Sequence, residues 1–339
     1  MKKNDDFDID FIIPWVDGSD SEWRKKFNFY APKTIEQLDI RDERYRDYGS
    51  LKYWFRSVEK FAPWVRKIYF ITDGQKPDWL DISNPKLVWI KHQDYIPKEF
   101  LPVFSSHPIE IFLNRLPGLS DRFVYFNDDL FLIKKVSKRY FFNKKGIPVD
   151  YASTNCMGIG IVDIPHIDVN NLELINYFFD KKVVLKKNFF KWFSLKTPKC
   201  FIQNLILSPW KTFNGITVRH FAIPYLKSTF YDVWNNCKVE LERTAKNKFR
   251  NLKEDINQWL FRYWQLCSGN FVPKRRYTTE KLYQLESLND KVLKSIMSSR
   301  IMEICINDDA KNNIDCTKNI QVLCNYFDKL LPEKSTFEK

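Results

Sequence analysis

Two adjacent aspartates, Asp128 and Asp129, occur within one of the most apolar stretches of the chain, FVYFNDDLFL at residues 123–132. Burying an unpaired carboxylate costs several kcal/mol or forces the group to take up a proton. Paired carboxylates suit a hard divalent cation, which can bridge to a diphosphate and neutralise a leaving group. The alternative is that both acids are solvated and cap the element that follows.

Other acidic residues follow predicted strands in the same way. Asp17 comes after an apolar run at 11–16, Asp73 after KIYFIT at 67–72, and a second Asn-Asp-Asp, at 307–309, after a strand predicted at 302–306. In a parallel sheet, ligands bind outside the carboxyl ends of the strands. We therefore expect the two single aspartates to converge with the first pair at one edge of the sheet.

The segment RDERYRD at 41–47 mixes charges of both signs. It is either a solvated loop with weak surface ion pairs or a place where Arg44 or Arg46 grips a phosphate in fork geometry. Arg56, on the helix predicted next, is expected either to join these arginines or to lie along the protein surface.

Four histidines are candidates for a general base, at positions 92, 107, 166 and 220. Histidine is the usual base near neutral pH, although a lone histidine is more often a hydrogen-bonded structural residue. His220 is slightly favoured because it follows a strand-like segment at 216–218. The spacing of the four excludes an HExxH zinc motif.

The elements that must position these side chains alternate along the first half of the chain. Helical patterns at 50–61 and 109–116 separate strands predicted at 11–16, 67–72, 87–90 and 122–126, and the turn at 17–20 is expected to cap a helix. Such alternation implies an α/β fold with a largely parallel sheet. From about residue 165 the pattern is mainly helical and basic, so we divide one domain into parts at 1–160, 161–300 and 301–339.

Composition bounds the class of protein. The chain has 339 residues, of which 44% are hydrophobic and 29% charged, as in a globular domain. Its 9 glycines form no GxxxxGK or GxGxxG loop, and its net charge of +13 favours anionic partners. Seven cysteines without CxxC spacing argue against a disulfide framework or a thiolate zinc site, and with the absence of a signal-like N-terminus they predict a cytoplasmic protein.

The segment 181–199 interleaves seven lysines with four aromatic residues. A basic, aromatic helix can lie on an anionic membrane surface, or it can pack its aromatic face into the core. Single-stranded nucleic-acid binding also uses aromatic residues in a basic groove, but no nucleic-acid-binding motif supports it here.

Four ordered blocks give the chain a resemblance to the Stealth phosphotransferases, which include bacterial capsule and exopolysaccharide enzymes. The blocks are IDFIIPWVDGSD (9–20); RYRD (44–47), FRSVEKFAPWV (55–65), ITDGQ (71–75), FSSH (104–107) and FNDD (126–129); RH (219–220), Pro224, KFR (248–250) and ED (254–255); and CIND (305–308) with PEKSTFE (332–338). The chain departs from many relatives at Gly49-Ser50, where they have an acid, and at Pro14, where they have threonine. His107 is not shared by all relatives and is not predicted as a base.

The resemblance implies a fold similar to the glycosyltransferase A type with extra helices. It implies that a nucleotide sugar, often a UDP-hexose, supplies sugar 1-phosphate to a hydroxyl of a glycan, and that the nucleoside monophosphate leaves. A divalent metal, Mg²⁺ or Mn²⁺, assists. The part at 1–160 would then bind nucleotide and metal, and the part at 161–300 would face the acceptor or membrane.

The resemblance also places roles on residues of this sequence. It implies His220 as the base, Asp128 with Asp129 or Asp17 as metal ligands, and Arg250 as a phosphate-binding group. The remaining substrate-binding positions are expected at Asp17, Gly18, Arg44, Arg56, Asp73, Ser106, Asn127, Asn307 and Asp308.

We therefore expect an enzyme that makes a phosphodiester-linked capsular or exopolysaccharide at the cytoplasmic face of the membrane, on a lipid-linked or growing glycan. Its partners are a nucleotide-sugar donor and a glycan acceptor, with membrane contact through 181–199 and no nucleic acid. One alternative is an ordinary metal-dependent glycosyltransferase, which releases the nucleoside diphosphate. Another is a non-catalytic basic protein that binds membrane or nucleic acid.

Overall fold

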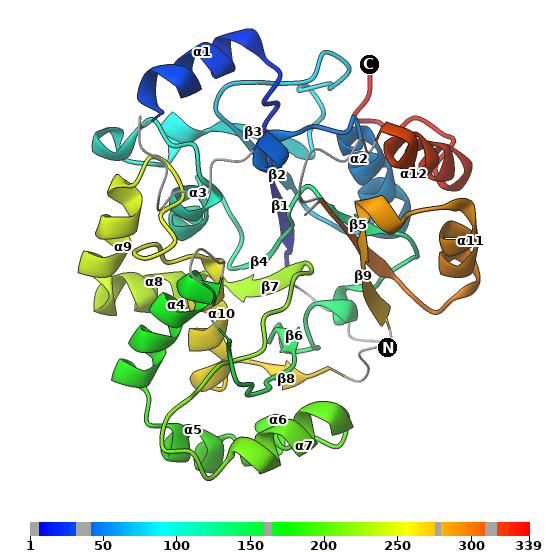
Figure 1. Ribbon diagram of the computed structural model, residues 1–339. Coiled ribbons are helices and arrows are strands. Elements are labelled where there is room, and N and C mark those ends of the chain that lie inside the picture. Colours follow the sequence, from blue (N-terminus) through cyan, green and yellow to red (C-terminus); the bar gives the residue numbers. More distant parts are fainter. Residues whose placement is uncertain (1–6, 32–41, 159, 161–164, 275–278, 309–316) are drawn as a thin grey trace.

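A five-stranded sheet forms the centre of the computed structural model, which describes residues 7–31, 42–158, 160, 165–274, 279–308 and 317–339 (Figure 1). The strand order is β3-β2-β1-β4-β7, with β1 to β4 parallel and β7 antiparallel to β4. The expected α/β class with a mostly parallel sheet is confirmed. The strands are β1 (Asp10–Pro14), β2 (Ile68–Thr72), β3 (Leu87–Lys91), β4 (Arg122–Tyr125) and β7 (Ile223–Leu226).

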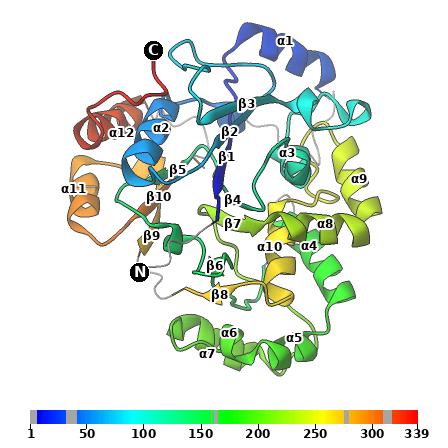
Figure 2. The ribbon, with the colours of Figure 1, turned by 180° about the vertical axis from the view of Figure 1, so that it is seen from behind.

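The central strands are apolar on both faces because helices cover both sides of the sheet. In β1, Phe11 and Ile13 belong to one core cluster, while Ile12 between them belongs to the other. Figures 1 and 2 show the helices of the two clusters on opposite sides of the sheet. The first cluster includes α2 (Leu51–Phe61), α11 (Asp290–Ser298) and α12 (Thr317–Leu330); the second includes α3 (Ser106–Ile111), α8 (Lys227–Asn236) and α10 (Gln258–Cys267).

A second sheet lies beside the first and contains the strand predicted late in the chain. It has the order β5-β10-β9, with β10 antiparallel to β5 and parallel to β9. The bounds are β5 (Leu130–Leu132), β9 (Glu280–Gln284) and β10 (Glu303–Asn307), while β6 (Val149–Asp150) and β8 (Val272–Pro273) form a short pair. The late strand is therefore confirmed, but it extends β5 rather than the central sheet.

The rest of the chain is mainly helical after residue 165, as expected. The elements there are α4 (Pro165–Phe178), α5 (Lys181–Lys187), α6 (Phe189–Trp192), α7 (Pro198–Leu207) and α9 (Lys238–Lys246). Near the N-terminus, α1 (Ser21–Tyr30) is capped by Asp20, whose Oδ1 accepts from Trp23 N at 2.7 Å. The predicted capping turn is thus confirmed. Within the described residues, no helix combines the length and apolar character needed to cross a bilayer.

Two predicted elements are wrong in their extent. The helix expected at 109–116 ends at Ile111, because side chains take the carbonyl groups it would need: Tyr95 Oη donates to Ile109 O and Trp234 Nε1 to Ile111 O. The strand-like segment 216–218 forms only a single bridge, between Ile216 and Thr154, and Arg262 donates to the Thr217 carbonyl. His220 therefore precedes a strand, β7, rather than following one.

The cysteines fit the expectation of a chain without disulfides. All six that the structure describes are free, and of these Cys156 is exposed while Cys200, Cys237, Cys267 and Cys305 are buried. Cys316, like Arg41 and Asp309 of the charged segments, lies outside the described residues.

Candidate active site

A cavity of about 410 Å³ opens where the parallel strands of the central sheet end. Trp15 follows β1, Asp73 follows β2 and Asn127 follows β4, and all three line it. The opposite wall comes from α3 and from the start of α10. The expected convergence is thus found for the aspartates after β2 and β4 (Asp73, Asp128 and Asp129), but not for Asp17 after β1.

Asp128 and Asp129 lie in the tight connection between β4 and β5, so the apolar residues around them form two strands and the acids occupy the turn. Leu130 N donates to Asn127 O at 3.2 Å across this turn. Asp128 is exposed to the cavity, whereas Asp129 is half-buried. Protein surrounds the cavity floor, and this desolvation, together with the nearby Asp129 and Asp47, raises the pKa of Asp128 to about 7.

Asp129 connects the turn to two other parts of the chain. Its Oδ2 lies 2.9 Å from His220 Nε2 and accepts from Cys305 Sγ at 3.2 Å. One ligand atom from each of these three residues lies within 4.8 Å of the others. Burial opposes protonation of His220, but the carboxylate of Asp129 outweighs it and raises the pKa of the imidazole.

The acids fit a divalent cation on two observations. Asp129 Oδ1 is buried without a hydrogen-bond partner among the described residues, and Asp128 carries a raised pKa that a cation would lower. Burial first, and then Asp129, raise the pKa of the Cys305 thiol, so Cys305 acts as a hydrogen-bond donor rather than a thiolate ligand. The available donors are therefore the carboxylate oxygens of the two aspartates, which suit a hard ion.

Basic and polar groups line the rest of the cavity. Arg250 Nη2 lies 3.4 Å from Ser106 Oγ, and Arg44 lines the same space. Asp308 accepts hydrogen bonds from Tyr48 Oη and from Arg46 Nη1, the latter at 3.1 Å, so it joins the segment after β10 to the one before α2. The predicted residues that line the cavity are Arg44, Asp73, Ser106, Asn127, Asp128, Asp129, His220, Arg250, Asn307 and Asp308.

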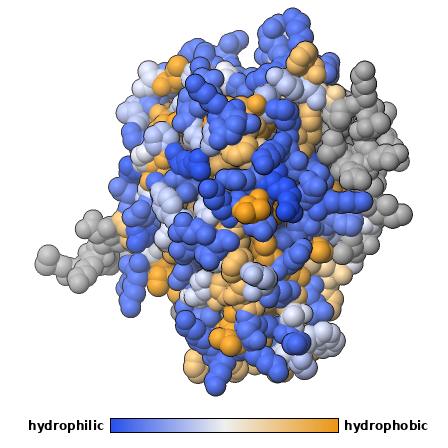
Figure 3. Space-filling model, turned by 90° about the vertical axis from the view of Figure 1, so that its left-hand side faces the viewer, coloured by the Kyte–Doolittle hydropathy of each residue, from blue (hydrophilic) through white to orange (hydrophobic). Residues whose placement is uncertain are grey.

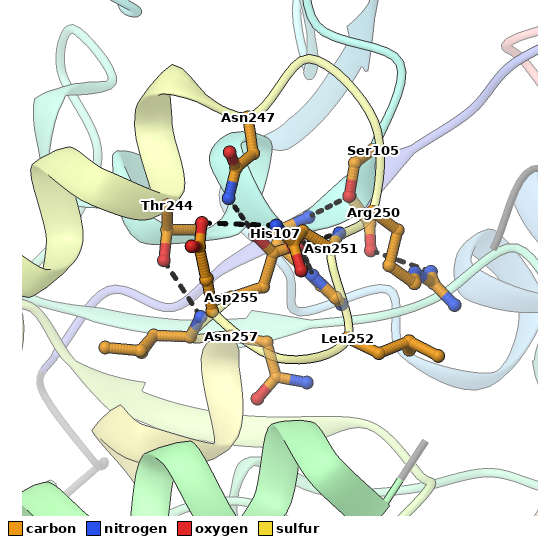
Figure 4. A network of polar contacts seen from close by, with 12 residues as sticks. Ser105, His107, Thr244, Asn247, Arg250, Asn251, Leu252, Asp255 and Asn257 are labelled. Atoms are coloured by element: carbon orange, nitrogen blue, oxygen red, sulfur yellow. Dashed lines mark hydrogen bonds and ion pairs between the residues drawn. The ribbon is translucent and has the colours of Figure 1, made fainter. Parts of the chain in front are cut away.

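A second histidine, His107, faces the cavity from α3 and is held by a buried network (Figure 4). Its Nδ1 lies 2.7 Å from Asp255 Oδ2. Asp255 also accepts from Asn247 Nδ2 at 2.8 Å and from Asn251 N at 2.9 Å. The carboxylate therefore fixes the orientation of the imidazole and of the loop that carries Arg250.

Three predicted residues do not line the cavity. The Asp17 carboxylate accepts from Ser19 N at 2.8 Å and so stabilises its own turn. Gly18 packs closely against Tyr45, which does line the cavity. A Cβ at position 18 would lie 2.5 Å from the carbonyl oxygen of Tyr45, so a residue with a side chain does not fit there.

Arg56 is the third of these residues, and it is already paired. Its guanidinium binds both carboxylate oxygens of Glu338 at 2.7 and 2.6 Å and donates to Leu331 O at 3.0 Å. The prediction that Arg56 grips a phosphate is corrected accordingly: this arginine attaches α2 to the C-terminal segment.

Some cavity residues were not predicted. Asp47 belongs to the charged run at 41–47 but was not singled out; it lies near Asp17 and Asp128, and burial raises its pKa. Glu110 is buried and accepts from Gln258 N at 2.9 Å. Like Asp128, Glu110 is an acid inside a largely apolar segment, SHPIEI, so the same sequence signal identifies it.

Comparison with known proteins adds the following findings. Residues 7–34 and 44–150 match the family models of Stealth protein conserved regions 1 and 2. The chain is 42% identical over 333 residues to the capsular polysaccharide phosphotransferase WcwK of Streptococcus pneumoniae, covering 98% of each chain. It is 38% identical over 333 residues to the exopolysaccharide phosphotransferase cps2G of Lactiplantibacillus plantarum, covering 98% of this chain and 97% of that one. Among solved structures it is similar to the galactosyltransferase LgtC, with a TM-score of 0.42 and 8% identity over 96% of each chain.

Proposed function

Because the chain belongs to the Stealth family, we propose that it is a phosphotransferase of capsular or exopolysaccharide synthesis. It transfers a sugar 1-phosphate from a nucleotide diphosphate sugar, a UDP-hexose or UDP-N-acetylhexosamine, to a hydroxyl of a glycan acceptor. The identity of 42% and 38% to two named polysaccharide phosphotransferases over nearly the whole chain supports this. The observation that carries the chemistry is the meeting, in one cavity, of the adjacent carboxylates of Asp128 and Asp129 with Arg44, Arg250 and His220.

The reaction breaks one bond of the diphosphate. The acceptor oxygen attacks the phosphorus that bears the sugar, the bond from that phosphorus to the bridging oxygen breaks, and the nucleoside monophosphate leaves with the bond's electrons. The sugar keeps its bond to phosphate, so its anomeric configuration is retained. Positioning and neutralisation of charge dominate the catalysis of such a transfer.

The carboxylates of Asp128 and Asp129 would hold a divalent ion, and this ion would supply positive charge to the diphosphate and the leaving group. Mg²⁺ or Mn²⁺ matches their oxygen donors. Arg250, held by Ser106, and Arg44 on the same cavity bind phosphate oxygens through charge-assisted hydrogen bonds.

His220 accepts the proton of the attacking hydroxyl. It can do so only as the neutral imidazole, and the Asp129 carboxylate favours the charged form. A cation held by Asp129 would draw on the same carboxylate, which would then stabilise the imidazolium less and favour the neutral imidazole. Ligand and base are in this way coupled through one carboxyl group.

The test is to incubate the protein with a panel of nucleotide sugars, a glycan acceptor and Mg²⁺, and to analyse the products by mass spectrometry. We expect a nucleoside monophosphate and a product heavier by a hexose phosphate. Release of the nucleoside diphosphate would assign the chain to ordinary glycosyl transfer instead.

Asp128→Asn is expected to lower the rate at least about a hundredfold, because it removes a ligand of the charge-neutralising ion. The matched control is Asp121→Asn, an exposed aspartate just before β4. Full activity of Asp128→Asn or of His220→Ala would overturn the proposed site.

A further inference from the structure

Apolar side chains gather on one outer surface of the helical part of the molecule. Ten of the seventeen large hydrophobic side chains that are exposed among the described residues lie between Tyr177 and Trp210. The most exposed are Tyr177 at 81%, Phe190 at 86% and Leu195 at 83%. We call the exposed surface of residues 177–212 the lysine–aromatic face. Clusters of this kind on a monomer mark a surface that meets an apolar partner.

In α7, a polar side chain faces the protein and apolar side chains face outward. This helix turns Asn204 inward, where the amide donates to Ala152 O at 2.9 Å and to Trp192 O at 2.6 Å and accepts from Thr154 N at 2.7 Å. Its remaining side chains are mostly apolar, so Ile202, Leu205 and Ile206 point to solvent, each more than half exposed. The helix is thus polar toward the protein and apolar toward the outside, the reverse of a helix that only packs.

The aromatic segment itself divides between core and surface. Trp192 is fully buried in the second core cluster, while Phe189 and Phe190 beside it are exposed. Packing against the protein therefore accounts for only some of these apolar residues. The others need a different environment.

The charges of the lysine–aromatic face decide what that environment is. Between Tyr177 and Thr212 the sequence has eight lysines, of which Lys181 and Lys191 donate to backbone carbonyls of the protein and the other six are exposed. The single acid, Asp180, caps α5, and its Oδ1 accepts from Val183 N at 2.9 Å. A second copy of the chain would bring like charges together, and protein interfaces are depleted in lysine at their centres. Lysines interspersed with aromatic and aliphatic side chains match an anionic lipid surface, where ring and alkyl groups enter the headgroup region and lysines meet phosphates.

We propose that the lysine–aromatic face lies on the surface of an anionic phospholipid bilayer. Figure 1 shows α5, α6 and α7 together at one end of the molecule, reached from the active-site region along α4. Ile167, in the first turn of α4, lines the cavity and Tyr177, near its end, belongs to the face, so the two are about 15 Å apart along the helix axis. In the view of Figure 3, apolar and hydrophilic surface alternate at the lower end of the molecule. The proposal concerns binding and does not rest on the chemistry proposed for the cavity.

The test is sedimentation of the full chain with large vesicles of phosphatidylcholine, alone or mixed with phosphatidylglycerol. We expect binding to the mixed vesicles that weakens with added salt, and little binding to phosphatidylcholine alone. Phe190→Ser/Leu195→Ser is expected to lower partitioning about tenfold or more, because two side chains no longer enter the bilayer. Both sites are more than four-fifths exposed, so the variant should fold normally. The matched control is Phe29→Ser/Val239→Ser, at positions 81% and 66% exposed elsewhere on the molecule.

The lysines are tested separately. Lys186→Gln/Lys187→Gln is expected to lower binding to the mixed vesicles several-fold and to reduce its salt dependence, while Lys76→Gln/Lys98→Gln, also at exposed positions, leaves both unchanged. Absence of vesicle binding, or equal binding by wild type and Phe190→Ser/Leu195→Ser, would overturn the proposal. So would a dimer in solution that this variant abolishes, because it would assign the face to self-association.

Discussion

The carboxyl group of Asp128 is a proposed metal ligand, and in the metal-free protein its ionisation opposes folding. Desolvation, Asp129 and Asp47 raise its pKa to about 7, against about 3.9 in an unfolded chain. Between these two values the folded state binds more protons than the unfolded state. The stability of the metal-free protein therefore falls as pH rises through this range.

Asp128→Asn is accordingly expected to increase the free energy of unfolding of the metal-free protein at pH 8, and to make no such difference at pH 4, although it removes activity. Urea unfolding in the presence of a chelator, at both pH values, measures this. Asp121→Asn serves as the control. A variant less stable than wild type at pH 8 would contradict the electrostatic account of the cavity floor.

Two effects on the pKa of His220, burial and the carboxylate of Asp129, can be separated by experiment. Burial lowers the pKa of His220 and Asp129 raises it, with the second effect larger. The favourable interaction is complete below the unfolded pKa of about 6.5 and is lost as pH rises through the higher folded pKa.

Replacing Asp129 by asparagine leaves burial as the largest effect on His220, with Arg44 acting in the same direction and Glu110 opposing, so the pKa of His220 should fall below about 6.5. Titration of the imidazole by NMR in metal-free protein tests this, with the half-buried His166, which lies on another part of the chain, as the internal reference. Adding Mg²⁺ to the wild type should shift the pKa of His220 in the same direction. A pKa that is unchanged in Asp129→Asn would remove Asp129 as the partner that controls the base.

At the scale of elements, α2 is joined to the C-terminal segment by Arg56 and Glu338, whose side chains are only 10% and 5% exposed. Arg56→Lys keeps the charge but cannot bind both carboxylate oxygens of Glu338 in bidentate geometry, so we expect the free energy of unfolding to fall by about 1.5–3 kcal/mol. The kcat and the KM for the donor should stay the same. Arg250→Lys should do the opposite, raising the KM for the donor with little change in unfolding. A raised donor KM for Arg56→Lys with unchanged stability would restore its predicted contact with phosphate.

Much of this level of structure could be predicted from sequence. The strands of the central sheet are short apolar runs. Asp73 follows β2 directly and Asp128 comes three residues after β4 ends, so local pattern and the geometry of a parallel sheet were sufficient. The partners of Arg56 and His107 could not be predicted from the sequence, because they lie 282 and 148 residues later in the chain. Residue spacing carries no information about such pairs. The strand before residue 220 was misplaced for a similar reason: Arg262 takes a carbonyl group there.

At the scale of the molecule, a buried cluster of charges joins the separate sheets next to the active site. Arg219, adjacent to His220, binds Glu280 of β9 at 2.6 Å, and Lys274 contacts the same carboxylate. Glu303 of β10 accepts from Ala222 N at 2.5 Å. The segment that carries His220 is thus fixed on both sides by groups from the second sheet.

Burial alone would raise the pKa of Glu280, but Arg219 and Lys274 outweigh it and lower the pKa to about 2. Its contribution to stability is therefore present above the unfolded pKa of about 4.3 and is lost as pH falls toward 2. Glu280→Gln removes the carboxylate that Arg219 and Lys274 share, and Arg219 keeps only the longer contact with Asp150, at 3.7 Å. We therefore expect a loss of about 3–5 kcal/mol at pH 7. Urea unfolding should show this loss, and the difference from wild type should narrow below about pH 4. A loss below about 1 kcal/mol would mean that water reaches the cluster.

The same cluster determines when the active site can be completed during translation. β4, which precedes Asp128, can pair with β1 once both have been synthesised, whereas β5, which follows Asp129, pairs with β10 near the end of the chain. His220 emerges later, and the groups that fix it, Glu280 and Glu303, emerge later still. A nascent chain that has passed residue 250 therefore holds every proposed catalytic side chain and still lacks a catalyst, because the strands that orient the base have not been translated.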